Sequence, residues 1–377
     1  MAPIDEFLDA FVASFDNNDS RTSWAEPDIG QTQLADLVAK VTTPPFVPTR
    51  RYLRLLLTRY ASNVEREAGC QIEDEALAEL IAEHAFGPSS LAAGPTAGGG
   101  MGGGDAPDPD AHGYVSFQVP HNGNSRTCTS SSPDEDIVGI QVYPHHNDVG
   151  IRKVWEAGAC LAEFLIAHPG QIRDKKVLEL GAGVGLTGIV AAGLCQVRHL
   201  HMTDYTEACL DNMEHNIFVN KEWLARQGVN VDNNVCSRKL TSGYLEWTEC
   251  AEGGDDENSR RAISTSEPFQ FSEAEVLLAA DVVYDASQIP SLVQSVKVLL
   301  SSGRVGVTND AAEKRKAIFA TTFRNEKTFA LFTNELRREG ISCNYVEKEA
   351  IASLPNIFPC YFTQPRSDVR ICTMTME

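Results

Sequence analysis

Residues 177–188 read VLELGAGVGLTG, and this stretch decides the fold of the chain. Its first four residues are apolar except for one acid, as expected of a buried strand, and the helical pattern LTGIVAAG follows. Between them lie Gly181, Gly183 and Gly185, where glycine lets the backbone turn sharply and lets a ligand approach the main chain. The helix that begins there points free N–H groups and a positive dipole end at the loop. The stretch predicts a strand, a loop and a helix that bind an elongated, partly anionic cofactor.

Two cofactors fit this loop, because two motifs overlap in it. Gly183, Gly185 and Gly188 fit the GxGxxG fingerprint of dinucleotide-binding proteins, with Asp204 near the position of the acid that binds the ribose. From Glu179 onward, the string ELGAGVG fits the ExGxGxG loop of proteins that bind S-adenosylmethionine. A third interpretation is a glycine turn that packs a helix on a strand without a ligand. The loop alone leaves all three interpretations open.

Strand and helix patterns alternate on both sides of the loop. An amphipathic helix is predicted at 155–168 and another helix at 207–220. Further strands are predicted at 199–205, 235–240, 274–285, 315–323, 341–348 and 369–376. The alternation predicts an α/β fold with a doubly wound, mostly parallel sheet, whose ligands bind at the carboxyl ends of the strands. The last two strands suit an antiparallel edge.

The composition divides the chain into three parts. Residues 1–86 show helical periodicity throughout and predict an N-terminal helical domain. Residues 87–136 begin with a long run of Gly, Pro and Ala and predict a flexible linker, which contains a candidate strand at 114–119. Residues 137–377 form the α/β domain, with an acidic surface insertion at about 249–267.

The charge and the cysteines exclude several classes of protein. A net charge of −20 argues against nucleic acid as the main partner and makes a basic protein segment more natural, although acids that only keep the chain soluble explain it equally well. The ten cysteines include no CxxC pair, the N-terminus does not resemble a signal peptide, and no metal site is expected. No apolar run approaches the roughly 20 residues needed to cross a bilayer. We therefore expect a cytoplasmic protein without a membrane partner.

Acidic and aromatic residues follow the predicted strands. Asp281 ends a buried strand, with Tyr284 three residues later, and an acid at that position is expected to face the ligand cleft. The alternative is a carboxylate that caps the next helix. Trp247 follows another predicted strand, where its indole either stacks on an adenine or packs in the core.

Six short motifs occur together in a fixed order. They are WEAG from residue 155, ELGAGVG from 179, TDY from 203, NIFVN from 216, LEW from 245 and AADVVY from 279. This order resembles that of the seven-strand S-adenosylmethionine-dependent protein methyltransferases marked by a DxxY motif. The resemblance displaces the dinucleotide interpretation, which offers no account of Trp155, Trp247 or the Asp281 and Tyr284 pair.

Within that family the chain is similar to the subgroup that methylates a lysine of eukaryotic elongation factor 2. The segments PPFVPTRRYLRLLL and TTFRNEKTFALFTNEL carry this similarity. The chain departs from the subgroup at Glu326, where a proline is usual, and at residues 301–315, which look like extra sequence. These departures concern the target protein more than the reaction.

The resemblance implies roles for twelve residues and a seven-stranded, Rossmann-like sheet. It implies that Asp281 and Tyr284 are catalytic and orient the acceptor amine, and that Arg324 and Asn325 shape the substrate site. The residues that it implies for binding S-adenosylmethionine are Trp155, Glu179, Gly181, Ala182, Gly183, Asp204, Trp247 and Ala280.

The function hypothesis is a monomeric, cytoplasmic protein-lysine N-methyltransferase that acts on elongation factor 2. One alternative is the same reaction on another protein. Another is a module that binds S-adenosylmethionine without catalysis.

Overall fold

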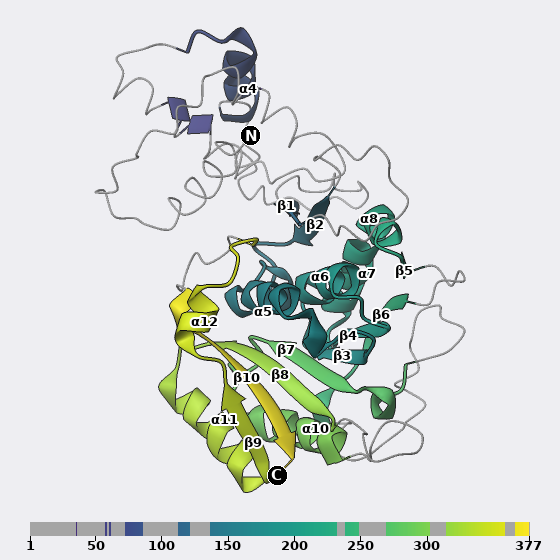
Figure 1. Ribbon diagram of the computed structural model, residues 1–377. Coiled ribbons are helices and arrows are strands. Elements are labelled where there is room, and N and C mark those ends of the chain that lie inside the picture. Colours follow the sequence, from purple (N-terminus) through teal and green to yellow (C-terminus); the bar gives the residue numbers. More distant parts are fainter. Residues whose placement is uncertain are drawn as a thin grey trace, which may run out of the picture. The chain divides into compact units, whose positions relative to one another are not determined.

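The structure is a computed structural model that describes residues 35, 57–58, 60–61, 72–85, 112–120, 136–231, 238–248, 269–301, 314–358 and 366–376. Its contacts divide the chain into two units, residues 1–115 with 141–146 and residues 116–140 with 147–377. The second unit holds a central sheet with helices on both faces (Figure 1). All twelve residues with a predicted role belong to this unit.

The central sheet has eight strands in the order β5-β6-β4-β3-β7-β8-β10-β9. The strands are β3 (Lys176–Leu180), β4 (His199–Asp204), β5 (Val229–Asn230), β6 (Arg238–Tyr244), β7 (Val276–Ala280), β8 (Lys316–Thr322), β9 (Ile341–Tyr345) and β10 (Val369–Met376). Only β10 runs antiparallel to its neighbours, β8 and β9. The predicted doubly wound, mostly parallel sheet is confirmed, and the two-residue edge strand β5 adds an eighth strand to the seven expected.

The order of the strands follows from their burial. β3 and β7 are short apolar runs that are buried along almost their whole length, as expected of parallel strands covered on both faces. β9 ends in exposed residues and lies at the edge. β6 is described from Arg238, and residues 235–237 of the strand predicted at 235–240 lie outside the described part of the chain.

Helices α5, α6 and α7 cover one face of the sheet, and α10 and α11 cover the other (Figure 1). The helices of this unit are α5 (Glu156–Ala167), α6 (Leu186–Leu194), α7 (Glu207–Val219), α8 (Lys221–Arg226), α10 (Ile289–Ser301), α11 (Glu326–Arg338) and α12 (Lys348–Ala352). α6 lies unusually close to its neighbours. A Cβ on Gly188 would stand 2.4 Å from the Met202 sulfur, and one on Gly193 would stand 2.2 Å from the Trp223 ring. The glycines of α6 therefore allow the close packing that brings its N-terminus over the end of β3.

The NIFVN motif joins α7 to a second, two-stranded sheet made of β1 (Gly113–Gln118) and β2 (Ile137–Val142). Asn220 donates to the carbonyl of Gly139 and accepts from its N–H, as a neighbouring strand would. Asn216 donates to the carbonyl of Val184 in the glycine loop. Both asparagines of the motif are buried, so their role here is to satisfy main-chain groups.

Helix α4 (Glu75–Ala85) is the described part of the predicted N-terminal helical region. It begins after Asp74, whose carboxylate accepts from the Leu77 N–H at 2.9 Å and caps the helix. The other helices predicted in residues 1–86 lie almost entirely outside the described residues, as do most of the predicted linker and the insertion at 249–267.

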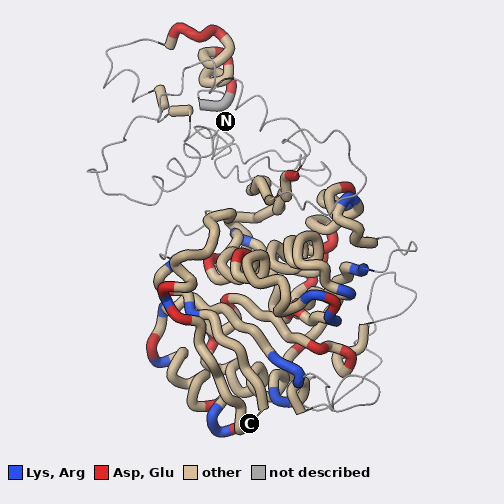
Figure 2. The backbone as a smooth tube through the Cα atoms, viewed as in Figure 1, with Lys and Arg blue, Asp and Glu red and all other residues tan. Residues whose placement is uncertain are grey.

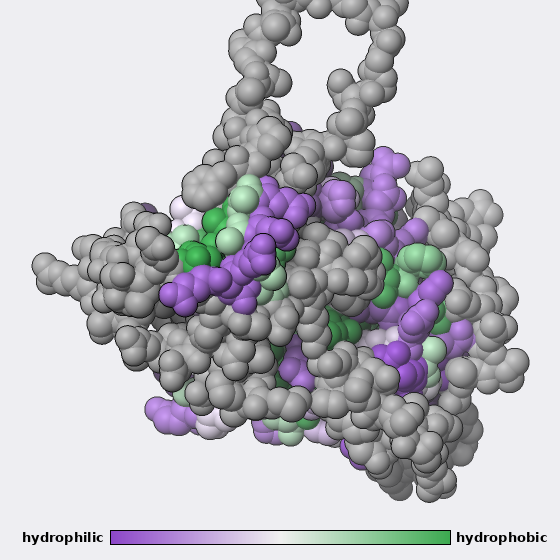
Figure 3. Space-filling view, turned by 90° about the horizontal axis from the view of Figure 1, so that it is seen from above, coloured by the Kyte–Doolittle hydropathy of each residue, from purple (hydrophilic) through white to green (hydrophobic). Residues whose placement is uncertain are grey.

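The described surface mixes charged and apolar groups. Basic and acidic residues are interspersed along the described chain (Figure 2), and hydrophobic and hydrophilic residues adjoin one another on the face seen in Figure 3. Among the described residues, no helix has the length and apolar character needed to span a membrane.

Candidate active site

The glycine loop after β3 adopts a backbone that only glycine takes without strain. Gly181, Gly183 and Gly185 have φ values of 62°, 55° and 81°, and Gly185 is the N-cap of α6. The Ala182 N–H donates to the carbonyl of Thr203 at 2.9 Å, and the Thr203 hydroxyl donates to the carbonyl of Glu179 at 2.6 Å. The loop is therefore held against the end of β4.

Asp204 ends β4 beside this loop. Its carboxylate accepts from the Gly183 N–H at 3.0 Å and from the Tyr205 N–H at 2.8 Å. The side chain is buried, and burial raises its pKa above the usual value, against the opposing effect of these hydrogen bonds. The acid predicted for the donor site thus directly contacts the loop predicted for it.

Trp247 lies on the other side of the loop. A Cβ on Gly181 would stand 3.6 Å from the Trp247 ring and 2.8 Å from the Val282 side chain. The indole is half-buried and also packs against the core beneath α10. The core packing expected of Trp247 is confirmed, and the stacking of its ring on an adenine stays a prediction, which its position beside the loop supports. Ala280 is the half-buried last residue of β7, the strand next to β3.

Glu179 lies beneath α6. A Cβ on Gly188 would stand 2.6 Å from its Oε2, and this oxygen has no hydrogen-bond partner among the described residues. Burial raises the pKa of the carboxyl to about 8, and the nearby charge of Asp204 adds to this, whereas hydrogen bonds with Thr187 and Gly188 lower it. Glu179 is therefore a largely protonated, buried acid that supports the start of α6.

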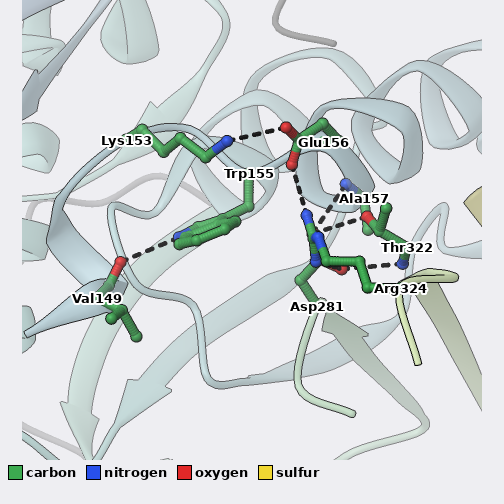
Figure 4. Close-up of polar contacts among 8 residues, drawn as sticks. All are labelled: Val149, Lys153, Trp155, Glu156, Ala157, Asp281, Thr322 and Arg324. Carbon is green, nitrogen blue, oxygen red and sulfur yellow. Dashed lines mark hydrogen bonds and ion pairs between the residues drawn. The ribbon is translucent and has the colours of Figure 1, made fainter. Parts of the chain in front are cut away.

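Asp281 follows β7 in a left-handed backbone conformation, with φ at 53°. Its carboxylate accepts from the Ala157 N–H at 3.2 Å, from the Thr322 N–H at 2.9 Å and from the Thr322 hydroxyl at 3.0 Å (Figure 4). Arg324 pairs with the same carboxylate at 3.1 Å. The Asp281 side chain is only 7% exposed, so its oxygens are used to join α5, β7 and β8.

Arg324 continues this network to the start of α5. Its guanidinium contacts Glu156 at 2.6 Å, and the fully buried Glu156 also pairs with Lys153 at 2.8 Å (Figure 4). The Arg324 and Lys153 cations lie 5.2 and 4.6 Å from the centre of the Trp155 ring. The Trp155 indole N–H donates to the carbonyl of Val149 at 3.0 Å. Trp155 is thus held in one orientation by two cations and a hydrogen bond.

Tyr284 is exposed, whereas the side chain of Asp281, its partner in the predicted catalytic pair, is buried. Tyr284 is 59% exposed, and its pKa is raised to about 12 by burial and by the neighbouring Tyr205 and acids, which include Asp204 and Asp148. Its hydroxyl therefore remains protonated at physiological pH, and Asp204 is among the acids that act on it electrostatically.

The two predicted substrate residues have structural contacts here. Arg324 belongs to the network around Asp281, and Asn325 caps α11 by accepting from the N–H groups of Lys327 at 2.9 Å and Thr328 at 3.3 Å. Sequence reasoning missed Glu156, Asp148 and Thr322. An acid at the first position of a mostly apolar helix was the available signal for Glu156, and an acid directly before VGI was the signal for Asp148.

The residues around the loop fit S-adenosylmethionine. They offer a loop with no Cβ atom at Gly181, Gly183 and Gly185, a carboxylate suited to ribose hydroxyls and an indole beside the loop. Trp155 is the N-cap of α5, and Ala280 is the last residue of β7.

Comparison with known proteins agrees with this assignment. The family model described as "Lysine methyltransferase" matches residues 134–328, just over half of the chain. The human protein FAM86B2 is 30% identical over 196 residues, which cover 52% of this chain and 52% of that protein. The human protein-lysine N-methyltransferase EEF2KMT is 27% identical over 191 residues, which cover 50% of each protein. The chain thus spans about half the length of the curated relatives that it matches.

Among solved structures, the O-methyltransferase from Bacillus cereus in complex with SAH matches with 14% identity and a TM-score of 0.34. The match covers 59% of this chain and 82% of that one.

Proposed function

This chain belongs to the lysine methyltransferase family, and from that premise we propose that it transfers a methyl group from S-adenosylmethionine to a lysine of another protein. One observation carries the proposal. Asp204 ends β4 and contacts the glycine loop through Gly183, and the exposed Tyr284 follows β7, so the two residues follow the carboxyl ends of the two parallel strands that flank β3. A donor site and a group suited to an acceptor therefore meet at one edge of the sheet.

We propose eukaryotic elongation factor 2 as the protein substrate. The motif order and the segments that contain Tyr52 and Arg324 support this target, as does the similarity to EEF2KMT. The same proposal includes a cytoplasmic location and a monomeric enzyme. The alternative is the same reaction on another protein.

The donor supplies a methyl group on a positively charged sulfur, and the methyl C–S bond breaks as the new C–N bond forms. The roles proposed for Trp155, Gly181, Ala182, Gly183, Asp204, Trp247 and Ala280 are to bind the donor and hold it in line with the amine. Glu179 would act indirectly, because it lies beneath α6 and supports the loop. We assign Asp281 the role of positioning the turn that carries Tyr284, since its oxygens already accept from Thr322, Ala157 and Arg324.

The acceptor lysine must lose its proton before it attacks, because the ammonium form has no lone pair. A free lysine has a pKa of about 10.4. The carboxylates near Tyr284 favour the charged lysine during the encounter, so the proton must leave after binding. We propose that the neutral Tyr284 hydroxyl accepts a hydrogen bond from the amine N–H and so directs the lone pair at the methyl group.

The test is transfer of labelled methyl groups from S-adenosylmethionine into an unmethylated cell extract. The variants are Asp204→Ala, Tyr284→Phe and the matched control Tyr345→Phe, a 43% exposed tyrosine of the edge strand β9. The proposal expects one labelled band at the mass of elongation factor 2, absent in Asp204→Ala, at least about tenfold weaker in Tyr284→Phe and unchanged in the control. A labelled band of another mass would keep the reaction and replace the target. Donor binding without any labelled protein would favour a module that binds the donor without catalysis.

A further inference from the structure

Asp148 lies outside every motif that the sequence analysis singled out, yet it contacts two elements beside the glycine loop. One carboxylate oxygen accepts from the Gly150 N–H at 2.8 Å and caps the short turn η3 (Val149–Ile151). The other oxygen accepts from the Thr206 hydroxyl at 2.5 Å. The Cys209 thiol, in α7, donates to this second oxygen as well, at 3.6 Å. Asp148 is half-buried, and its hydrogen bonds divide the carboxylate between two parts of the fold.

The first part is the turn that lies against the glycine loop. A Cβ on Gly183 would stand 2.7 Å from the carbonyl oxygen of Gly150, so the turn and the loop are in close contact. The carbonyl of Val149 accepts from the Trp155 indole N–H. The position of the turn therefore sets the position of Trp155.

The second part is the segment that follows β4. The Thr206 hydroxyl accepts from the Cys209 N–H at 3.1 Å and caps α7. Thr206 comes two residues after Asp204, whose carboxylate contacts Gly183. Asp148 therefore links the element that holds Trp155 to the element that holds Asp204, across the loop between them.

We propose that Asp148 is a positioning residue that sets the separation between Trp155 and Asp204 and thereby determines the affinity for the donor. The inference rests on the proposed function, since it needs S-adenosylmethionine to lie along the glycine loop. A cap of the three-residue turn needs only one carboxylate oxygen. The hydrogen bond between the second oxygen and Thr206 adds little to the stability of the turn. Its effect is to set the distance between Trp155 and Asp204, the two residues proposed to contact S-adenosylmethionine.

The experiment measures calorimetric binding of S-adenosylhomocysteine to the full chain. Asp148→Ala is expected to weaken binding at least about tenfold, because it removes a charge-assisted hydrogen bond on each side of the loop. Thr206→Val removes the hydroxyl bond to Asp148, leaves the bonds from Gly150 and the Cys209 thiol, and is expected to weaken binding by about fivefold. Thr206→Ser keeps the hydroxyl and is expected to restore most of the affinity. Asp74→Ala, which also removes a capping carboxylate but lies in α4, is the control for the loss of charge and is expected to bind as the wild type does.

Kinetics separate positioning from a structural role. Asp148→Ala is expected to raise the KM for the donor in parallel with the loss of binding, while kcat at saturating donor stays within about threefold. Unchanged binding in Asp148→Ala, with a wild type that binds, would overturn the inference and leave the proposed function intact. A weakening accompanied by an equal loss of kcat and a large fall in the ligand-free melting temperature, in both Asp148→Ala and Thr206→Val, would also overturn it. A wild type that does not bind S-adenosylhomocysteine would overturn the proposed function itself.

Discussion

The turns after β4 and β7 each carry an aspartate at the carboxyl end of a strand next to β3, but the two carboxylates are used differently. Asp204 accepts from two main-chain N–H groups and has a raised pKa. Asp281 accepts from main-chain, hydroxyl and guanidinium donors on two other elements. A carboxylate whose negative charge is only partly balanced by hydrogen-bond donors can still gain a hydrogen bond from a ligand hydroxyl. A carboxylate whose oxygens already accept from several donors would have to give up one of those bonds to bind a ligand. The comparison supports the donor-binding role proposed for Asp204 and indicates an architectural role for the Asp281 side chain.

The largest expected effect is that of Asp281→Ala on stability. The change leaves the Thr322 and Ala157 N–H groups and the Arg324 cation without their buried acceptor, which should cost about 3–5 kcal/mol of unfolding free energy. Urea denaturation measures this loss. An unfolding free energy within about 1 kcal/mol of wild type would contradict the architectural role of this turn.

The pH dependence of stability should reveal the acid beside Asp204. The pKa of Glu179 is raised to about 8 in the fold, so the folded state keeps a proton that the unfolded chain releases near pH 4.5. Stability from this group is therefore present at low pH and is lost as pH rises from 4.5 to about 8, by roughly 4–5 kcal/mol. Glu179→Gln should flatten this part of the profile, as measured by denaturation at several pH values. An unchanged slope in the variant would show that Glu179 is ionised in the fold.

Asp204→Asn should affect the donor more than the fold. The amide oxygen can still accept from the Gly183 N–H, but the amide NH2 then faces the Tyr205 N–H, which loses its acceptor. Because the burial of a charge is relieved at the same time, stability should fall by only about 1 kcal/mol. Affinity for S-adenosylhomocysteine should fall about tenfold, because the charged acceptor for the ribose hydroxyls is lost. Paired calorimetry and denaturation of this variant and Asp281→Asn test the comparison directly. Equal effects of the two variants on both quantities would remove the distinction between the turns.

The smallest effect is expected from Arg324→Lys. Lysine keeps the charge but cannot contact Glu156 and Asp281 at once as the planar guanidinium does, which should cost about 1 kcal/mol of stability. Lys297→Arg, in the ion pair of α10 with Glu339, is a control that keeps a single contact and should be neutral. Melting temperatures measure both changes. A lysine variant as stable as the wild type would show that one of the two contacts contributes nothing.

Local patterns predicted the elements well. The glycine loop, the acid at the end of β4 and the alternation of strands and helices depend on backbone geometry and on burial, and both are written in short stretches of sequence. Asn325 shows the limit of such patterns. The resemblance to the family implies a substrate role for this residue, which stays a prediction, and the structure shows its side chain capping the helix that begins beside it. An asparagine before a helix serves either purpose, and only its neighbours in space distinguish them.

The sequence by itself determined the class of fold, the strand-loop-helix unit and the order of motifs that marks the family, because each depends on residues close together in the chain. The tertiary structure decided how each acid is used. Asp281 meets a donor 124 residues away at Ala157, and Arg324 meets Glu156 across 168 residues. Whether a carboxylate is saturated or available depends on such distant partners, and no local pattern specifies them.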